Sequence, residues 1–384
     1  MSRPRLHLVT TVPLSLATLL HGQPRALAEH FDVHLVTADG PLVDRVLRQE
    51  GLPIRIVPMT RQITPRSDAA ALAALTAFFG RERPDIVQTY TPKAGLIGML
   101  AARAACVPHR IHGIVGMPLM EATGRRAAIL TATERLTYAC ATDLTSNSTG
   151  LRTWVHDHLT RKPITVIGHG SINGVDTAAW RRRMSDAERD AHRATIDIDP
   201  DDVVFLFVGR IVRDKGVEEL VEAFDAVHRV HPHAKLLMVG DFEPDLDPVN
   251  AATAHALDHH PGIRRTGFAH DVRPWASIAD VFVLPSYREG LPNSLIEAGS
   301  MGLPSIATDI NGCNEVIVPG ENGVLVPVRD GGRLRDEMQR MIDDPLHFAK
   351  LRAASRPSIV RRFDQRWFHG ELVKYYLDRL ESRG

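Results

Sequence analysis

Short runs of valine, isoleucine and leucine alternate with longer alanine-, leucine- and arginine-rich segments along almost the whole chain. Such alternation is typical of βαβ units, in which a helix follows each strand of a parallel sheet. In the first half the predicted strands are RLHLVTTV, FDVHLVT, IRIVPM, DIVQTY, RIHGIV, DLTSNS and ITVIG. A second series follows, with VVFLFVG, KLLMVG, VFVLP, PSIATD and GVLVPV. The pattern therefore predicts an α/β protein with two doubly wound parallel sheets.

The length of the chain also indicates more than one domain. At 384 residues it exceeds the size at which a single hydrophobic core usually stops growing. A segment rich in Gly, Asp and Arg separates the two strand series, and we place the boundary near residues 168–176. We predict two Rossmann-like domains, at 1–168 and 169–355, that face each other across a cleft. The remaining residues, 356–384, are predicted to form a terminal helix that packs on a core already built.

Composition excludes several classes of protein. The 46 basic residues balance the 46 acidic ones, so bulk charge would not gather a nucleic acid. The three cysteines form no CxxC motif, which predicts neither a disulfide framework nor a zinc site. No signal peptide is evident, and Arg103 interrupts the most apolar helical segment before the ~20 residues of a membrane span. We predict a cytoplasmic protein and leave open peripheral contact with the inner membrane face.

The loop after the first strand of the second series has the chemistry of a phosphate site. In VGRIVRDKG, Gly209 lets the backbone approach a ligand, while Arg210 and Lys215 offer donors to phosphate oxygens. The alternative is a solvated basic loop that Asp214 neutralises. The chain has neither a Walker loop nor a GxGxxG fingerprint, which counts against an ATPase or a dehydrogenase.

Two glutamates flank the next predicted helix start, in YREGLPNSLIEAG. We expect this helix to begin near Pro292 with Asn293 as its cap, which places Glu289 before the helix and Glu297 in its second turn. A helix N-terminus attracts anions, so a diphosphate would sit there. Carboxylates repel phosphate, and the glutamates would therefore bond hydroxyls of the attached sugars. The alternative is that both only complement the helix dipole, each contributing about 0.3–1 kcal/mol.

Three motifs in order resemble one family. VGR with DKG, then ADVFVLPSYREGLPNSLIEAGSMGLPSIATD, then NGCNEVIVPGENGVLVPV resemble the family-four retaining glycosyltransferases of GT-B fold, over about residues 200–345. The resemblance implies that Arg210 and Lys215 hold the donor diphosphate, that Glu297 bonds the ribose and that Glu289 bonds the transferred sugar. It places further donor contacts at Gly209, Gly267, Phe268, Gly290, Asn293, Ser294 and Leu295. It also implies that the terminal helix crosses back onto the first domain, against the alternative of an ordinary helix on the second.

The first half resembles the subset of this family that builds bacterial polysaccharides. RIHGIVGMP places His112 near a strand end, and the resemblance implies that this histidine faces the transferred sugar. The alternative is a core or capping histidine, since the chain has 19. The Gly-Gly pair that many members carry after the first strand is missing, so Thr11 and Ser15 are only weak acceptor-side candidates. We interpret the Asp245-x-Asp247 pair as a surface loop and predict no metal.

The resemblance implies a retaining hexosyltransferase. It would move a sugar from a nucleotide-diphosphate donor, in the simplest case a UDP-hexose or UDP-N-acetylhexosamine, to a hydroxyl of a glycan, a lipid-linked sugar or a small molecule. The first domain would bind the acceptor and the second the donor, with no obligatory cofactor. Two alternatives stay open: a nucleotide-sugar epimerase or hydrolase of the same fold, and a non-catalytic nucleotide-sugar-binding protein. The sequence does not settle the oligomeric state.

Overall fold

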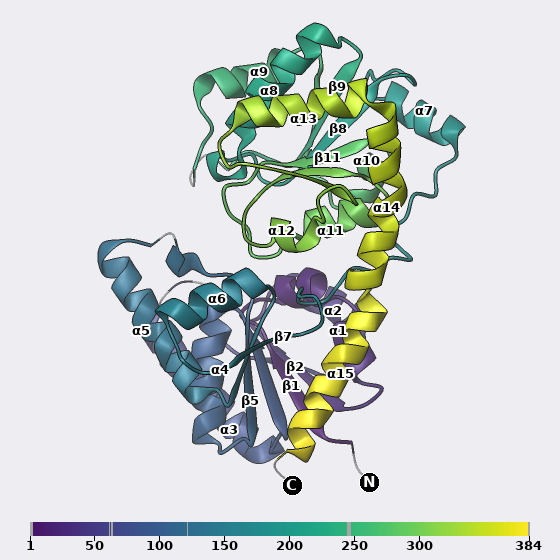
Figure 1. The fold of residues 1–384 in the computed structure, drawn as a ribbon. Coiled ribbons are helices and arrows are strands. Elements are labelled where there is room, and N and C mark those ends of the chain that lie inside the picture. Colours follow the sequence, from purple (N-terminus) through teal and green to yellow (C-terminus); the bar gives the residue numbers. More distant parts are fainter. Residues whose placement is uncertain (1–2, 61, 63, 121, 244–246, 383–384) are drawn as a thin grey trace. The chain divides into compact units, whose positions relative to one another are not determined.

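The chain folds into two compact units. The computed structural model describes residues 3–60, 62, 64–120, 122–243 and 247–382. Unit 1 comprises Met1–Gly174 and Gln365–Gly384, and unit 2 comprises Val175–Asp364 (Figure 1). The first border falls inside the segment predicted at 168–176, and the second lies after the predicted 355. The Asn173 side chain donates to the His21 carbonyl of unit 1 at 3.0 Å, and Phe363 is buried in the core of unit 2.

Unit 1 is built on a seven-stranded parallel sheet of order β3-β2-β1-β4-β5-β6-β7. Its strands are β1 Arg5–Val9, β2 Asp32–Thr37, β3 Ile54–Ile56, β4 Ile86–Tyr90, β5 His109–Ile114, β6 Asp143–Ser146 and β7 Ile164–Val166. Its helices are η1 Ser15–Leu19, α1 Gln23–Leu27, α2 Val43–Glu50, α3 Pro65–Glu82, α4 Pro92–Ala104, η2 Pro118–Met120, α5 Gly124–Cys140, α6 Thr149–His158 and α15 Gln365–Glu381. The strand order reverses between β1 and β4, which makes the unit doubly wound as predicted.

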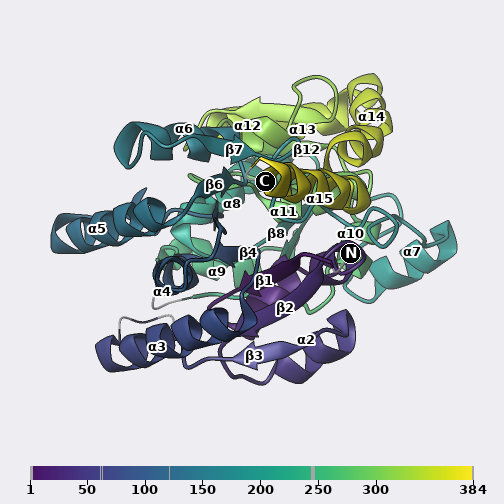
Figure 2. The same ribbon diagram turned by 90° about the horizontal axis from the view of Figure 1, so that it is seen from below.

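Both faces of this sheet are covered. Figure 2 shows α3, α4 and α5 on one side of the strands and α15 on the other. Alternation along β1 sends Leu6 and Leu8 to the cluster that contains α15, and Val9 to the cluster beneath α3 and α4. Leu372 and the fully buried Tyr376 fix α15 in the first of these cores. The last helix is therefore an integral part of unit 1.

The predicted terminal helix is in fact two helices. The first, α14 (Pro345–Phe363), belongs to unit 2, and the second is α15. Asp364 between them leaves the helical region with ψ 131°, and its carboxylate accepts the hydroxyl proton of Thr177 at 2.5 Å. The break therefore comes from a contact made across the sequence, not from a local helix-breaking residue.

Unit 2 carries a six-stranded parallel sheet of order β10-β9-β8-β11-β12-β13. Its strands are β8 Val203–Val208, β9 Ala234–Val239, β10 Ile263–Gly267, β11 Val281–Leu284, β12 Ser305–Thr308 and β13 Gly323–Val326. The remaining helices are α7 Asp186–Ala194, η3 Arg213–Lys215, α8 Val217–Val230, α9 Ala251–His259, α10 Arg273–Ile278, α11 Asn293–Ser300, α12 Cys313–Val316 and α13 Gly331–Asp343. The central strands are buried on both faces, which is why they read as continuous apolar runs.

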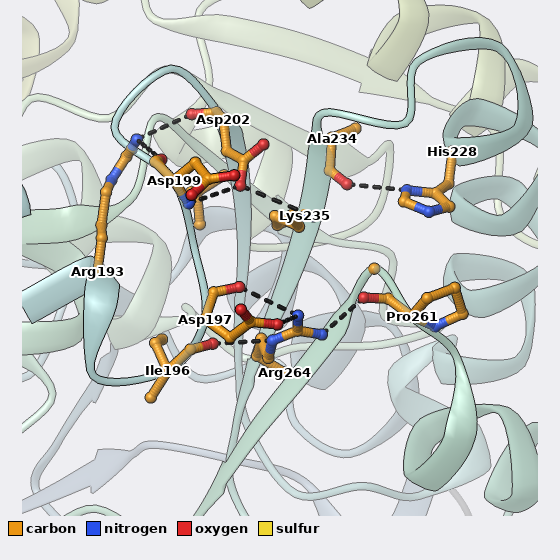
Figure 3. A network of polar contacts seen from close by, with 12 residues as sticks. Arg193, Ile196, Asp197, Asp199, Asp202, His228, Ala234, Lys235, Pro261 and Arg264 are labelled. Carbon is orange, nitrogen blue, oxygen red and sulfur yellow. Dashed lines mark hydrogen bonds and ion pairs between the residues drawn. The ribbon is translucent and has the colours of Figure 1, made fainter.

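A dense polar network lies at the amino ends of these strands (Figure 3). Arg193 is fully buried, and its guanidinium donates to the carbonyls of Pro200 and Asp202 at 2.9 Å and to the Asp280 carboxylate at 2.8 Å. Arg264 donates to the carbonyl of Ile196 at 2.8 Å. These contacts fix α7 and the loop after it. Because ligands bind at the carboxyl ends of parallel strands, we interpret the network as structural.

Two further properties of the fold concern membranes and metals. Over the described ranges, no helix is long and apolar enough to cross a membrane. The same ranges contain no group of three or more His, Cys, Asp or Glu side chains that could hold a metal ion. Asp245 of the predicted surface pair lies outside the described residues. Asp247 is described, and its carboxylate accepts the Asp214 N–H at 2.9 Å.

Candidate active site

The site predicted in unit 2 lies where its strand order reverses. The sheet winds outward in both directions from β8 and β11, and such switch points place two loops side by side at the carboxyl edge. The loop after β8 carries Arg210 and Lys215, and the loop after β11 carries Glu289. The topology therefore brings the basic motif and the first glutamate to one edge.

A glycine allows the two loops to touch. Gly216 adopts the left-handed conformation, with φ at 67°, and a Cβ there would lie 2.1 Å from the carbonyl oxygen of Pro285. No other residue type fits both the conformation and the space. The Tyr287 N–H also donates to the Asp214 carbonyl at 2.8 Å. The DKG motif is thus needed for packing as well as for charge.

Lys215 and Glu289 form an ion pair at this junction. The Lys215 ammonium lies 2.7 Å from Oε1 of Glu289, and the Ser286 hydroxyl donates to the same oxygen at 2.8 Å. The two side chains are only 16% and 14% exposed, so solvent screens the pair weakly. Within the described part of the chain, Oε2 of Glu289 has no hydrogen-bond donor. This oxygen is available to a ligand hydroxyl.

A second set of contacts fixes the loop that carries Glu289. Arg288 donates to the Asp214 carboxylate at 2.8 Å, and the Tyr287 hydroxyl donates to Glu219 at 2.6 Å. Arg329 lies over the Tyr287 ring, 4.5 Å from its centroid. Burial raises the pKa of Asp214, whereas Lys215 and Arg210 oppose that rise. We call Asp214, Tyr287 and Arg288 the clamp. Sequence reasoning missed it, because its partners lie up to 74 positions apart.

The clamp leads to a first prediction. Asp214→Asn keeps the size of the side chain but removes the charge that holds Arg288, so the Glu289 loop should lose its fixed position. We expect kcat to fall about tenfold, since misplaced groups near the reaction are costly. The free energy of unfolding should change by only about 0–1 kcal/mol, because Arg288 is 39% exposed. Steady-state rates and thermal melting measure the two effects.

A matched variant separates the clamp from a general loss of surface charge. Asp258→Asn breaks another ion pair of unit 2, with Arg265, at an exposed position on α9. It should leave kcat unchanged. Equal losses in the two variants would contradict the positioning role of Asp214.

Helix α11 begins at Asn293, but its cap is not the predicted one. Pro292 occupies the cap position with an extended ψ of 109°, and Asn293 is the first helical residue. The Leu295 N–H already donates to the Pro292 carbonyl at 3.2 Å. Among the described residues, the N–H groups of Asn293 and Ser294 find no backbone acceptor. These two, not three, are the donors that the helix start offers to an anion.

The loop that follows β12 also holds the loop before α11 in place. Asn311 donates its side-chain amide to the carbonyls of Glu289 and Gly290, at 3.1 and 3.2 Å. Gly312 adopts a φ of 82°, and a Cβ there would lie 2.3 Å from the Gly290 carbonyl oxygen. The NGCNE motif therefore supports the backbone around Gly290.

Glu297 lies in the second turn of α11 as predicted. Burial raises the pKa of its carboxyl to about 7. No hydrogen bond to this carboxylate occurs within the ranges that the structure describes. A buried carboxyl group with a raised pKa and no hydrogen-bond partner lowers the stability of a fold. Such groups are often found at functional sites.

The raised pKa predicts how stability depends on pH. Because Glu297 binds its proton more tightly in the folded state, its contribution is complete below about pH 4.5 and is lost as pH rises through 7. Glu297→Gln should therefore unfold at higher denaturant than the parent at pH 8, and the difference should vanish near pH 4. Glu297 keeps some contact with solvent, so we expect about 1–2 kcal/mol. Urea unfolding at both pH values tests this; a pH-independent difference would contradict it.

Arg210 lies at the same edge with a partner of its own. It is 47% exposed, and its guanidinium lies 3.0 Å from the Glu243 carboxylate. The preceding Gly209 is a point of close approach, since a Cβ on Gly240 would lie 1.9 Å from the Gly209 carbonyl oxygen. A ligand that binds at this edge would share the Arg210 guanidinium with Glu243 or displace it.

The predicted base-binding positions follow β9 and β10. Gly267 has a φ of 69°, and its carbonyl accepts the Gly240 N–H at 2.9 Å. The Phe268 N–H donates to the Asp241 side chain at 3.1 Å, so this backbone donor is already engaged. The Phe268 ring is 66% exposed and meets His270 edge to face. Its assignment to the base stays a prediction.

In unit 1, His112 is enclosed rather than open. It lies inside β5, is 3% exposed, and its Nδ1 is 2.8 Å from the Thr89 hydroxyl. Helix α4 covers the ring so closely that a Cβ on Gly95 would lie 2.4 Å from Cε1. Burial lowers the pKa of His112 to about 4, which leaves it neutral near pH 7. The alternative of a core histidine fits this packing, and a role toward the sugar stays a prediction.

The weak acceptor-side candidates lie at the switch point of unit 1. Thr11 is buried, and its hydroxyl accepts the Ala94 N–H at 3.2 Å and lies 2.7 Å from the Thr91 hydroxyl. Thr11 thus caps α4, while Ser15 begins the π-helix η1. Thr91, which sequence reasoning missed, has a φ of 74° that is rare for a β-branched residue. Such strain often marks a functional segment, but nothing in the sequence signalled it.

Family models match both halves of the chain. The model described as "Glycosyl transferase 4-like domain" matches residues 17–170, and "Glycosyl transferases group 1" matches residues 202–344. Among solved structures, Anabaena HepE in complex with UDP and glucose has a TM-score of 0.80 at 16% identity, over 98% of this chain and 100% of its own. Sucrose-phosphate synthase from Thermosynechococcus elongatus has the same score at 19% identity, over 99% and 100% of the two chains. These likenesses establish the GT-B fold.

Sequence relatives identify the family. The chain is 29% identical to the UDP-Gal:alpha-D-GlcNAc-diphosphoundecaprenol alpha-1,3-galactosyltransferase of Escherichia coli, over 82% of this chain and 81% of that one. It is 30% identical to the capsular polysaccharide biosynthesis glycosyltransferase CapM of Staphylococcus aureus, over 96% of both chains. Since this second match spans nearly the whole of both proteins, the chain belongs to the family-four glycosyltransferases of GT-B fold.

Proposed function

We propose that this glycosyltransferase moves a hexose or N-acetylhexosamine from a UDP donor to a hydroxyl of a lipid-linked diphosphate sugar, with retention of configuration, in the assembly of a bacterial polysaccharide. The observation that carries the proposal is the Lys215–Glu289 pair at the ends of β8 and β11, with Oε2 of Glu289 open to a ligand. The acceptor class is supported by the name of the Escherichia coli relative, which specifies a UDP-sugar and a diphosphoundecaprenol-linked sugar. In this proposal unit 2 binds the donor and unit 1 the acceptor.

The proposed chemistry depends on stabilising the leaving group. The bond between the anomeric carbon and the diphosphate oxygen breaks, and the acceptor oxygen bonds to the same face of that carbon. The acceptor proton passes to the departing phosphate oxygen, so UDP leaves with it and no enzyme carboxylate attacks. Lys215, Arg210 and the N–H groups of Asn293 and Ser294 would stabilise the charge as it develops.

The glutamates would hold hydroxyls on either side of the diphosphate. Glu289 would accept a hydroxyl of the transferred sugar at Oε2 and so fix the anomeric carbon for attack. Glu297 would accept the ribose hydroxyls, which would supply the partners that its carboxylate lacks. Ribose binding should then draw Glu297 into its ionised form. No resident metal or cofactor enters this scheme.

The test is whether UDP release requires an acceptor. We expect UDP-galactose, UDP-glucose or UDP-N-acetylglucosamine to give UDP only when a polyprenyl-diphosphate sugar in detergent is added, and NMR of the product to show the donor's anomeric configuration. UDP release at the same rate without acceptor would indicate a hydrolase. Tight binding of the donor without turnover would indicate a non-catalytic protein.

A further inference from the structure

Helix α5 of unit 1 carries an apolar stripe that the described residues of the unit leave exposed. Ile129, Ala132, Leu136 and Ala139 follow each other at helical spacing, and Ile129 and Leu136 are 50% and 45% exposed. The opposite side of α5 packs on α4, and Figure 2 shows α5 at the outside of the unit. Exposed large side chains aligned on one helix face mark a contact surface more often than scattered ones do.

The exposed charges of helix α5 itself all have one sign. Arg125 and Arg126 in the first turn and Arg135 further along are the charged side chains that α5 exposes. Its single carboxylate, Glu134, is buried at 6% exposure. We call the four stripe residues together with Arg125 and Arg126 the α5 patch. A helix that presents aliphatic side chains beside arginines, with no exposed acid, complements an anionic lipid surface.

The place of the patch in the fold fits this partner. Helix α5 follows β5, so its arginine-bearing first turn lies toward the carboxyl edge of the sheet, where parallel sheets bind ligands. Met120, at the end of the short helix η2 that contacts α5, is 47% exposed and adds a large apolar side chain near that edge. A second copy of the chain is a weaker candidate, because two α5 patches would bring like charges together.

We propose that the α5 patch docks unit 1 on a membrane surface that contains anionic lipid. The aliphatic side chains would enter the boundary between headgroups and acyl chains, while Arg125 and Arg126 would pair with lipid phosphates. The docking stands on the geometry of α5 alone. Only its purpose, to reach a lipid-linked acceptor, rests on the proposed function.

Vesicle sedimentation tests the docking without donor or acceptor. The full chain should bind vesicles of phosphatidylglycerol and phosphatidylcholine, bind phosphatidylcholine alone far less, and detach as salt is raised. Arg125→Gln with Arg126→Gln should weaken binding about tenfold, as should Ile129→Gln with Leu136→Gln. All of these side chains are solvent-facing, so melting temperature and activity on a detergent-solubilised acceptor should be unchanged.

Helix α2 provides the matched controls. It lies on another side of unit 1 and exposes Arg45, Arg48 and Leu47, the last by 41%. Arg45→Gln with Arg48→Gln makes the same change of charge, and Leu47→Gln replaces one exposed aliphatic side chain; both variants should leave vesicle binding intact. The proposal is overturned if the parent does not bind the anionic vesicles, if the α2 variants lose as much binding, or if the α5 changes instead convert a dimer to a monomer. If the parent binds anionic vesicles but releases no UDP when donor and lipid-linked acceptor are added, the result would count against the proposed function alone.

Discussion

Lys215→Ala is expected to lower kcat by about two to three orders of magnitude while the protein stays folded. In the proposed mechanism the Lys215 ammonium is a principal charge that meets the diphosphate as its bond to the sugar breaks, and removing one such donor typically costs 10²–10³ in rate. UDP should also bind at least tenfold more weakly. Initial rates with saturating donor, together with titration by UDP, measure both effects.

The same variant leaves Glu289 without its cation. The Ser286 hydroxyl still donates to Oε1, so the unpaired carboxylate should cost only about 1 kcal/mol of folding free energy, seen as a fall of a few degrees in melting temperature. Lys350→Ala, on the exposed face of α14, is the control and should change neither rate nor UDP affinity. Near-normal turnover in Lys215→Ala would contradict the assignment of the phosphate site.

Most of the fold could be predicted because buried parallel strands appear in the sequence as continuous apolar runs. VVFLFV reads as one apolar run, and the structure forms β8 over the same residues. The terminal helix could not be divided in the same way. Residues 345–381 keep a helical composition throughout, and the break at Asp364 depends on Thr177, which lies 187 positions away. The local sequence pattern carries no information about a contact between residues so far apart.

The same distinction applies to the site: local motifs indicated single residues but not the contacts between distant loops. Motif chemistry indicated Lys215 and Glu289, because charged residues in loops after buried strands lie at the carboxyl edge. It indicated Glu297 because this residue lies in the second turn of the helix that starts at the same edge. It could not indicate that Lys215 and Glu289 pair with each other, nor that Asp214 holds Arg288, since both contacts join loops that meet only in the folded sheet. The cap of α11 was assigned wrongly for a local reason. Asparagine is the better cap by preference, yet Pro292 already has the extended backbone that a cap needs, which moves Asn293 into the first turn.

Glu289→Gln should change UDP binding and turnover in opposite directions. Without ligand, Glu289 neutralises Lys215, so a diphosphate that arrives must compete with this carboxylate for the ammonium and is repelled by its charge. The amide removes both obstacles, and UDP should bind about three- to tenfold more tightly. Turnover should nevertheless fall about 10²-fold, because the amide accepts the sugar hydroxyl less strongly and no longer fixes the anomeric carbon. UDP titration and steady-state rates measure the two quantities.

The opposite signs are what distinguish this role from a structural one. If Glu289 only supported the loop, its loss would disorder Lys215 and weaken UDP binding and turnover together. Glu321→Gln provides the matched change, since it removes a carboxylate that pairs with Arg361 at 3.0 Å on the surface of unit 2, and it should alter neither quantity. Without UDP, Glu289→Gln should be less stable than the parent by about 1–2 kcal/mol, because Lys215 is 16% exposed and loses its counter-ion. With saturating UDP this deficit should shrink, because the diphosphate then supplies the negative charge that the glutamate provided.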